Sequence, residues 1–168
     1  MSDLLINKVS DSVLLTIDLA DYYPTQPVIL FDIKEYLFMG LILKEKDFRE
    51  ALKNIPLQQY TQKIVAITCS ADAIIPMWAN MLIVSYLQPV AVDIYFGNEL
   101  EVKKQILIQN IAALSTEEFI DKRVVVKGCG ALPIDEAAYI EITKKIRPVA
   151  KSIMYGEPCS TVPIFKRK

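Results

Sequence analysis

The second half of the chain alternates between short apolar runs and longer segments with helical periodicity. Short runs that are rich in β-branched residues predict buried strands. Three such strands are predicted: KIVAIT (63–68), AVDIYFG (91–97) and RVVVKG (123–128). Helices are predicted between and after them, over 76–87, over 98 to about 114, and from Pro133 onward. Alternation of this kind with short connections predicts a parallel sheet covered by helices.

Local signals indicate where the predicted helices begin. Pro76 suits the first position of a helix, and Pro133 opens another. Asn98 and Glu101 have the spacing of a capping box. The helix over 76–87 carries apolar residues nearly all round, so we expect it to be central and buried.

The first sixty residues are less regular. VLLTIDL (13–19) and VILFD (28–32) are predicted as strands, and 46–55 as an amphipathic helix. We expect this part to flank the sheet, with an edge hairpin as one arrangement. No internal repeat, low-complexity stretch or Gly/Ser linker is expected. The prediction is a single α/β domain over 1–168, mainly a parallel sheet covered by helices, with a less regular N-terminal segment.

Composition narrows the classes of function. Hydrophobic residues make up 52% of the 168 residues and the formal net charge is −1, so no basic surplus points to nucleic acid. The chain has no histidine, which excludes Ser–His–Asp and Cys–His catalysis within one chain. The start MSDLLINKVSD lacks a signal-peptide pattern, and prolines and polar residues interrupt the most apolar stretch, 74–92. With an odd cysteine count, these features predict a cytoplasmic protein with free thiols and no membrane partner.

The three cysteines are predicted to lie where parallel sheets bind ligands. Cys69 directly follows one predicted strand, and Cys129 follows another. Cys159 lies in GEPCSTVP (156–163), which is expected to be a loop that folds back over the same edge. Ligands of open parallel sheets bind outside the carboxyl ends of the strands. One shared three-thiol site is therefore predicted, provided that both strands belong to one sheet.

Such a site suits a soft metal or a sulfur species. Thiolates bind iron–sulfur clusters, iron and zinc. Three thiolates leave one position open for water, substrate or a transferred sulfur. Further ligands or polar groups are available near the cysteines in sequence: Asp72, Glu157, Ser160 and Thr161. A partner chain that completes the site is an alternative, and a homo-oligomer is a candidate assembly.

Three other interpretations remain open. In the first, one thiolate is the nucleophile of a transferase or hydrolase, with Asp72, Glu157 or Lys127 as the base. In the second, Lys127, Gly128 and Gly130 bind an anion such as phosphate, although no nucleotide-binding motif is present. In the third, the cysteines are small core hydrophobes of a protein-interaction module.

Four stretches carry a resemblance to a known family: FDIKEYLFMGLILKEKDFREAL (31–52), TCSADAIIPMWANMLIVSYL (68–87), VVVKGCG (124–130) and RPVAKSIMYGEPCSTVPIFKRK (147–168). They look like a bacterial protein family of unknown function, and the resemblance covers nearly the whole chain. The resemblance implies a genomic neighbourhood with the iron–sulfur assembly system, and it makes Cys69, Cys129 and Cys159 the thiol-bearing positions. The resulting hypothesis is an accessory protein in iron–sulfur cluster or sulfur handling, with iron–sulfur assembly proteins as partners. A binding or carrier protein is favoured over a turnover enzyme.

Overall fold

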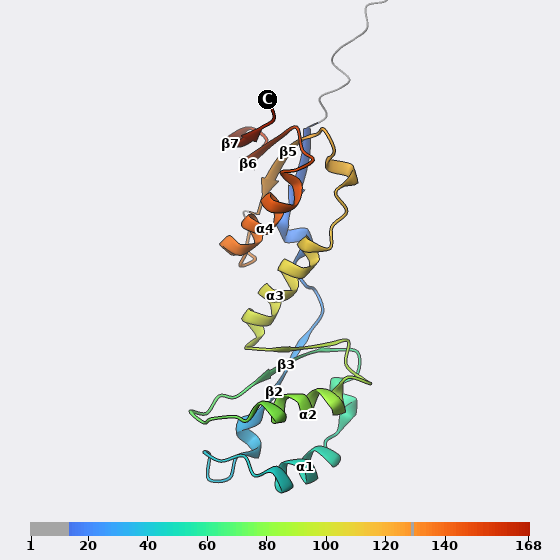
Figure 1. Cartoon of the computed structure of the whole chain (residues 1–168), viewed down its shortest axis with the longest axis vertical. Coiled ribbons are helices and arrows are strands. Elements are labelled where there is room, and N and C mark those ends of the chain that lie inside the picture. The colour runs from blue at the N-terminus through green and yellow to red at the C-terminus, as the bar shows by residue number, and fades with distance from the viewer. Residues whose placement is uncertain (1–13, 129) are drawn as a thin grey trace, which may run out of the picture. The chain divides into compact units, whose positions relative to one another are not determined.

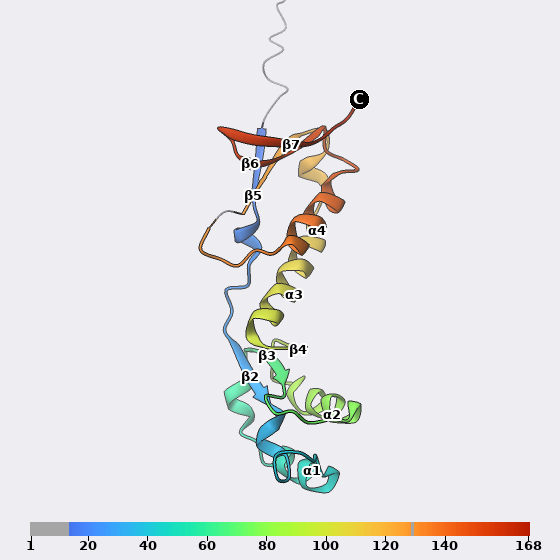
Figure 2. The same cartoon turned by 90° about the vertical axis from the view of Figure 1, so that its left-hand side faces the viewer.

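The computed structural model describes residues 14–128 and 130–168. Within these residues the chain forms two compact units. Unit 2 is the continuous segment Thr25–Lys103, and unit 1 combines the residues up to Pro24 with Lys104–Lys168. Each unit is described by itself, and Figures 1 and 2 label the elements of both. The single domain expected over 1–168 stays a prediction.

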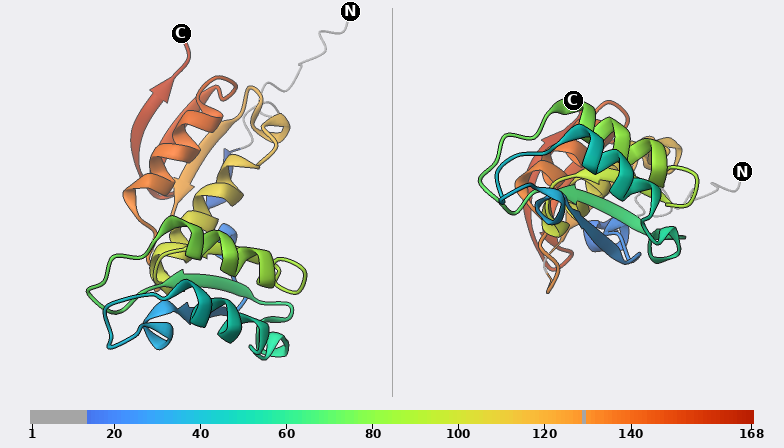
Figure 3. Two further views of the ribbon diagram at one scale, coloured as in Figure 1. Left: turned by 60° about the horizontal axis from the view of Figure 1, so that its bottom comes forward. Right: turned by 90° about the horizontal axis from the view of Figure 1, so that it is seen from below.

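Unit 2 is a parallel sheet of three strands covered by two helices. The strands have the order β2-β3-β4 and are β2 Val28–Asp32, β3 Ile64–Thr68 and β4 Asp93–Phe96. The helices are α1 Glu45–Lys53 and α2 Met77–Leu87. The 3-10 turns are η2 Ile33–Tyr36 and η3 Leu57–Tyr60. Figure 3 shows both helices on the same side of β2 and β3.

One apolar core holds unit 2 together. Alternate residues of the strands share a face of the sheet, so Phe31, Val65 and Ile67 face the helices. Buried residues of α1 and α2 pack against them: Phe48, Leu52, Ala79, Ile83 and Leu87. Burial of these side chains is the main contribution to the stability of the unit, at about 1.5–3 kcal/mol for each large aliphatic or aromatic residue.

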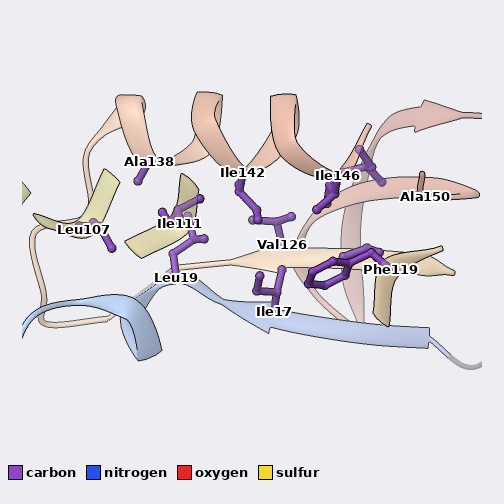
Figure 4. Close-up of a cluster of buried hydrophobic side chains, with 12 residues drawn as sticks. Ile17, Leu19, Leu107, Ile111, Phe119, Val126, Ala138, Ile142, Ile146 and Ala150 are labelled. Atoms are coloured by element: carbon purple, nitrogen blue, oxygen red, sulfur yellow. The ribbon is translucent and has the colours of Figure 1, made fainter. Parts of the chain in front are cut away.

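Unit 1 has the same arrangement with one more strand. Its sheet has the order β1-β5-β6-β7, with β1 Leu14–Asp18, β5 Arg123–Lys127, β6 Ser152–Glu157 and β7 Ser160–Lys166. The helices are α3 Glu99–Ala112, within which unit 2 ends, and α4 Glu136–Ile146. The 3-10 turns are η1 Leu19–Tyr22 and η4 Glu117–Phe119. Figure 4 shows Ala138, Ile142 and Ile146 of α4 pointing toward the strands, into a core shared with Ile17 and Val126.

The two units are copies of one fold. Each runs through strand, 3-10 turn, helix, 3-10 turn, strand, helix and strand, and unit 2 follows η1 of unit 1 in the sequence and ends within α3. The strand registers correspond, because Asp32 lies opposite Thr68 in unit 2 and Asp18 lies opposite Lys127 in unit 1. Residues 45–98 of unit 2 correspond without a gap to residues 104–157 of unit 1.

Sequence and backbone both carry the repeat. QPVAVDIYFG (88–97) and RPVAKSIMYG (147–156) are identical at five of ten positions. Equivalent residues also share the left-handed region: Gln62 (φ 59°) with Asp121 (φ 56°), and Gly97 (φ 136°) with Gly156 (φ 121°). The expectation of no internal repeat is therefore wrong. The identities are few and scattered, so the repeat becomes plain only when strand register aligns the copies.

The α/β class with mainly parallel strands is confirmed, and two details of it are corrected. The strands predicted over 63–68 and 123–128 do not share one sheet, because β3 lies in the sheet of unit 2 and β5 in that of unit 1. The N-terminal strands do not form an edge hairpin. Instead β1 pairs in parallel with β5 in unit 1, and β2 pairs in parallel with β3 in unit 2, so each copy of the fold has its own first strand.

Two of the predicted helix starts are confirmed, whereas the helix expected from Pro133 begins at Glu136, with Asp135 as its N-cap. Pro76 precedes α2, and the capping box forms, with the Glu101 N–H donating to Asn98 Oδ1 at 3.0 Å and the Asn98 N–H to Glu101 Oε2 at 2.8 Å. The expected complete burial of α2 is wrong. Only one face packs on the sheet, while Met77 and Met81 are 80% and 73% exposed. No helix within 14–128 or 130–168 is long and apolar enough to cross a membrane.

The C-terminal segment is a hairpin instead of the expected loop. Strands β6 and β7 pair in an antiparallel way, with Glu157 opposite Ser160, so Pro158 and Cys159 form the two-residue turn. Gly156 is required just before this turn, because its φ is +121° and a Cβ would overlap the carbonyl oxygen of Ser160.

Candidate functional site: a cavity at the carboxyl edge of unit 2

A cavity of about 690 Å³ opens at the carboxyl ends of β3 and β4. This edge is where open α/β sheets bind ligands, and the volume lies in the usual range for small-molecule sites. The wall is mostly apolar, with a few polar groups among its residues: Ile33, Thr68, Cys69, Ala71, Ala73, Ile75, Met77, Asn80, Phe96, Gly97 and Glu101. All of them belong to unit 2.

Asp32 fixes the loop that carries Cys69. Its Oδ1 accepts the backbone N–H of Ser70 at 3.0 Å, and its Oδ2 accepts the Ser70 hydroxyl at 2.6 Å. Oδ1 also caps η2 by accepting the Lys34 N–H at 3.0 Å. Burial raises the pKa of Asp32, but these hydrogen bonds to the charged form outweigh it and hold the pKa below its usual value. The position of Cys69 is therefore set from the end of the neighbouring strand.

Two polar side chains give the cavity its chemistry. The half-buried Cys69 thiol donates to the carbonyl oxygen of Ala71, with 3.6 Å between sulfur and oxygen. Asn80 Oδ1 is buried and has no hydrogen-bond partner among the described residues. A buried acceptor without a partner costs free energy.

The electrostatics of the wall disfavour anions. Of the described residues that line the cavity, only Glu101 carries a charge, and its carboxylate accepts the Asn98 N–H. Phosphates and carboxylates would meet this negative charge without a Lys or Arg partner in the wall. The cavity therefore suits a neutral or positively charged molecule with a large apolar part.

The equivalent place in unit 1 is filled. Tyr139 corresponds to Asn80 and Gly128 to Cys69. A Cβ atom at Gly128 would overlap the Tyr139 hydroxyl oxygen, so the tyrosine occupies the space that the Cys69 side chain takes in unit 2. A smaller apolar cavity of about 300 Å³ lies beside Tyr139 in unit 1. Close approach of this side chain is a structural reason for glycine at position 128.

The other predicted site residues of unit 1 lie around Lys127. Its Nζ pairs with Asp18 Oδ2 at 3.2 Å. The hydrogen bond with Asp18 and the nearby charge of Glu157 raise the pKa of Lys127. The backbone N–H of Ala20 is the main cause of the lowered pKa of Asp18, to which Lys127 adds. Anion binding by Lys127, Gly128 and Gly130 stays a prediction, made less favourable by these two carboxylates.

The remaining predicted residues are dispersed. Cys159 is exposed at the turn of the hairpin, between Glu157 and Ser160. The hydroxyl of Thr161 contacts Met154 Sδ at 3.7 Å, and Asp72 is exposed in the loop after Cys69. Cys129 lies outside the described residues.

The predicted shared sheet edge is wrong, because the strands that precede Cys69 and Cys129, β3 and β5, belong to different sheets. Within the part of the chain that the structure describes, no group of three Cys, Asp or Glu side chains is arranged to hold a metal ion. A three-thiol site stays a prediction that needs an arrangement other than a shared sheet edge.

Comparison with known proteins identifies the family of this chain but provides no activity, ligand or partner. The family model described as "Protein of unknown function (DUF2480)" matches residues 3–167. The chain belongs to the DUF2480 family. No curated protein and no solved structure matches this DUF2480 chain. The expected membership of a family of unknown function is confirmed, and the family brings no activity with it.

Sequence reasoning missed Asn80, Phe96 and Gly97. One signal was available for Asn80, because the segment MWANMLIVSYL of α2 has no charge and Asn80 is its only side-chain amide. An amide in so apolar a helix is unusual and needs a partner. Phe96 ends β4, Gly97 follows it, and neither carries a comparable signal.

Proposed function

We propose that this DUF2480 protein binds a small, mainly apolar molecule without negative charge in the cavity around Cys69. The observation that carries the proposal is the cavity of about 690 Å³, whose mostly apolar wall includes Cys69 and Asn80. The position at the carboxyl edge of a parallel sheet and the single negative charge of Glu101 support it. The protein is a binding protein in this proposal, with Cys69 as a wall residue and not as a nucleophile.

Alkylation of Cys69 provides the test. In the Cys129→Ser/Cys159→Ser background, a thiol reagent reports on Cys69 alone. A panel of small neutral and cationic compounds should contain members that slow alkylation and raise the melting temperature together. The control is the same panel on the Cys69-free chain with Cys159 retained, where alkylation should be unaffected. Failure of every compound to protect Cys69 would contradict the proposal.

An accessory role in iron–sulfur cluster or sulfur handling is the second candidate. The exposure of Cys159 at a hairpin turn favours it, since a donor or acceptor protein can reach this thiol. The family resemblance adds iron–sulfur assembly proteins as proposed partners, and a homo-oligomer that completes a metal site stays a further prediction.

Elemental analysis distinguishes the two candidates. Protein purified without oxygen is analysed for iron, zinc and acid-labile sulfide, alongside Cys69→Ser, Cys129→Ser and Cys159→Ser. One metal or cluster per chain that disappears in the variants would establish the thiol site. Absence of metal and sulfide after reconstitution would remove the cluster hypothesis and leave the Cys69 cavity as the candidate.

A further inference from the structure

Cations are concentrated at the amino edge of the unit 1 sheet, the edge opposite to the one that carries Lys127. Strands β5 and β6 begin there, and the antiparallel strand β7 ends there, so three neighbouring strands contribute residues to one place. Each strand contributes two consecutive residues at this edge: Lys122 and Arg123, Lys151 and Ser152, and Lys166 and Arg167. Five of these six residues are cations, and none is a carboxylate.

Strand register places three of the cations in one row. The Lys151 N–H donates to the Lys122 carbonyl oxygen at 2.8 Å, and the Arg167 N–H donates to the Lys151 carbonyl oxygen at 2.9 Å. Neighbouring strands lie about 4.8 Å apart, and like charges directly opposite each other destabilise a sheet. The row therefore costs free energy that a bound anion would recover.

Asp121 neutralises only one member of this row. It pairs with the Arg167 guanidinium, which also donates to the carbonyl oxygens of Pro148 and Val149 at 3.2 and 2.8 Å. The side chains of Lys122 and Lys151 are exposed and have no hydrogen bond or ion pair with any residue that the structure describes. Two neighbouring ammonium groups are thus available to a ligand.

Two cavities lie at this edge, and Lys151 lines both. The first, of about 510 Å³, also has Lys122 and Lys168 in its wall, together with the pair of Asp121 and Arg167. The second, of about 480 Å³, also has Arg123 and Lys166 in its wall. Both volumes lie in the usual range for small-molecule sites.

Unit 2 shows that the fold itself does not require these cations. The Val92 N–H donates to the Lys63 carbonyl oxygen at 2.9 Å, as Lys151 does to Lys122 in unit 1. The four edge positions of β5 and β6 correspond in unit 2 to Lys63, Ile64, Val92 and Asp93. These positions hold one cation and one carboxylate in unit 2, but three cations and no carboxylate in unit 1. The charge is therefore a property of unit 1 and not of the fold.

We infer that the amino edge of the unit 1 sheet binds a small molecule that carries at least two phosphate groups. This site is independent of the proposed cavity function, since the cavity around Cys69 belongs to unit 2. Ammonium groups bind phosphate oxygens through charge-assisted hydrogen bonds. A phosphate group concentrates up to about two negative charges on three acceptor oxygens, and two such groups match a cluster of several cations.

The distribution of charge favours a small ligand over a macromolecular surface. The whole chain has a net charge of −1, so the residues outside this edge are together negatively charged. Nucleic acid and anionic membranes present extended negative surfaces, which need a correspondingly extended basic surface. A compact polyphosphate needs only the edge itself.

Pyrophosphate is the probe, and isothermal titration calorimetry of the full chain measures its binding. In about 150 mM NaCl, charges more than about 8 Å apart are largely screened, so close contacts determine the affinity. Lys122→Gln and Lys151→Gln should each weaken binding about tenfold, because each removes a charge-assisted contact. Lys63→Gln is the matched control, at the position of unit 2 that corresponds to Lys122, and should leave the affinity unchanged.

Thermal unfolding provides a second measurement and shows that the variants fold. Without pyrophosphate, Lys151→Gln should melt no lower than the wild type, because the substitution removes like-charge repulsion. Pyrophosphate should raise the melting temperature of the wild type and of Lys63→Gln, and should raise that of Lys151→Gln less.

Several results would overturn the inference. One is that pyrophosphate does not bind at millimolar concentration. Another is that Lys63→Gln weakens binding as much as Lys151→Gln does, which would indicate general attraction to a cation. Orthophosphate that binds as tightly as pyrophosphate would remove the need for two phosphate groups. Binding of oligothymidine, or of phosphatidylcholine vesicles that contain phosphatidylinositol bisphosphate, without binding of pyrophosphate would assign the edge to nucleic acid or to a membrane instead.

Discussion

The hydroxyl oxygen of Tyr139 lies over Gly128, in the space that a Cβ atom would otherwise take. The equivalent pair in the other copy of the fold is Asn80 and Cys69. Unit 1 thus combines the large Tyr139 with a glycine, whereas unit 2 combines the smaller Asn80 with the larger Cys69. The two copies have the same order of elements and the same strand register, so the different side-chain volumes at these positions decide which copy has the larger cavity at this sheet edge.

Gly128→Ala should destabilise the protein by about 1–2 kcal/mol, because the new methyl group displaces a packed tyrosine ring. Tyr139→Asn should relieve that overlap, so the double variant should lose less than the sum of the single variants. Urea denaturation of the four proteins gives the coupling free energy. Gly130→Ala is the control, since nothing lies within 4 Å of a Cβ there. Additive effects would show that Tyr139 does not require the glycine.

Gly97→Ala and Gly156→Ala should both destabilise the protein, because both glycines lie in the left-handed region. The expected cost of the backbone conformation is about 1–2 kcal/mol for each substitution. Gly156→Ala should cost more than Gly40→Ala, since its Cβ would also overlap the carbonyl oxygen of Ser160, whereas nothing lies within 4 Å of a Cβ at Gly40, whose φ is also positive. Thermal unfolding of all three variants checks the order. The reverse order would contradict the packing described for the β6–β7 turn.

The contribution of Asp32 to stability should depend on pH. Its pKa is lower in the folded chain than the ordinary value of 3.8, so its stabilisation is complete above that value and is lost as the pH falls through the folded pKa. Asp32→Ala should cost about 1–2 kcal/mol at pH 7, through the lost cap of η2 and the lost bonds to Ser70. The difference in the free energy of unfolding between Asp32→Ala and the wild type should shrink in acid. Denaturation at pH 7 and pH 3 measures it, with the exposed Asp72→Ala as the control.

Cys159 should react with thiol reagents faster than Cys69, because it is exposed at a turn while Cys69 is half-buried. In chains that also carry Cys129→Ser, we expect a rate difference of about tenfold at pH 7.5, from accessibility alone. Rates are compared in Cys69→Ser and Cys159→Ser versions of that chain. Equal rates in urea would confirm that folding causes the difference. A faster Cys69 in the native chain would instead indicate an activated nucleophile and revive the enzyme hypothesis.

Much of the local structure could be predicted from the sequence. The strands before Cys69 and around Val125, the helix after Pro76 and the Asn98 capping box depend on periodicity and on contacts within a few residues. Such features are encoded locally, so a single sequence suffices for them. The cysteine site did not follow in the same way, because it depended on which strands share a sheet.

Local patterns were therefore sufficient for the α/β class, the order of strands and helices, and membership of a family without an assigned activity. The pairing of β1 with β5 and of β2 with β3, which divides the strands between two sheets, emerged from the folded chain alone. The tertiary structure also decided that Asn80 borders a cavity while Tyr139 fills the equivalent space. The physical reason is that strand pairing and side-chain packing join residues far apart in sequence, and local patterns carry little information about such contacts.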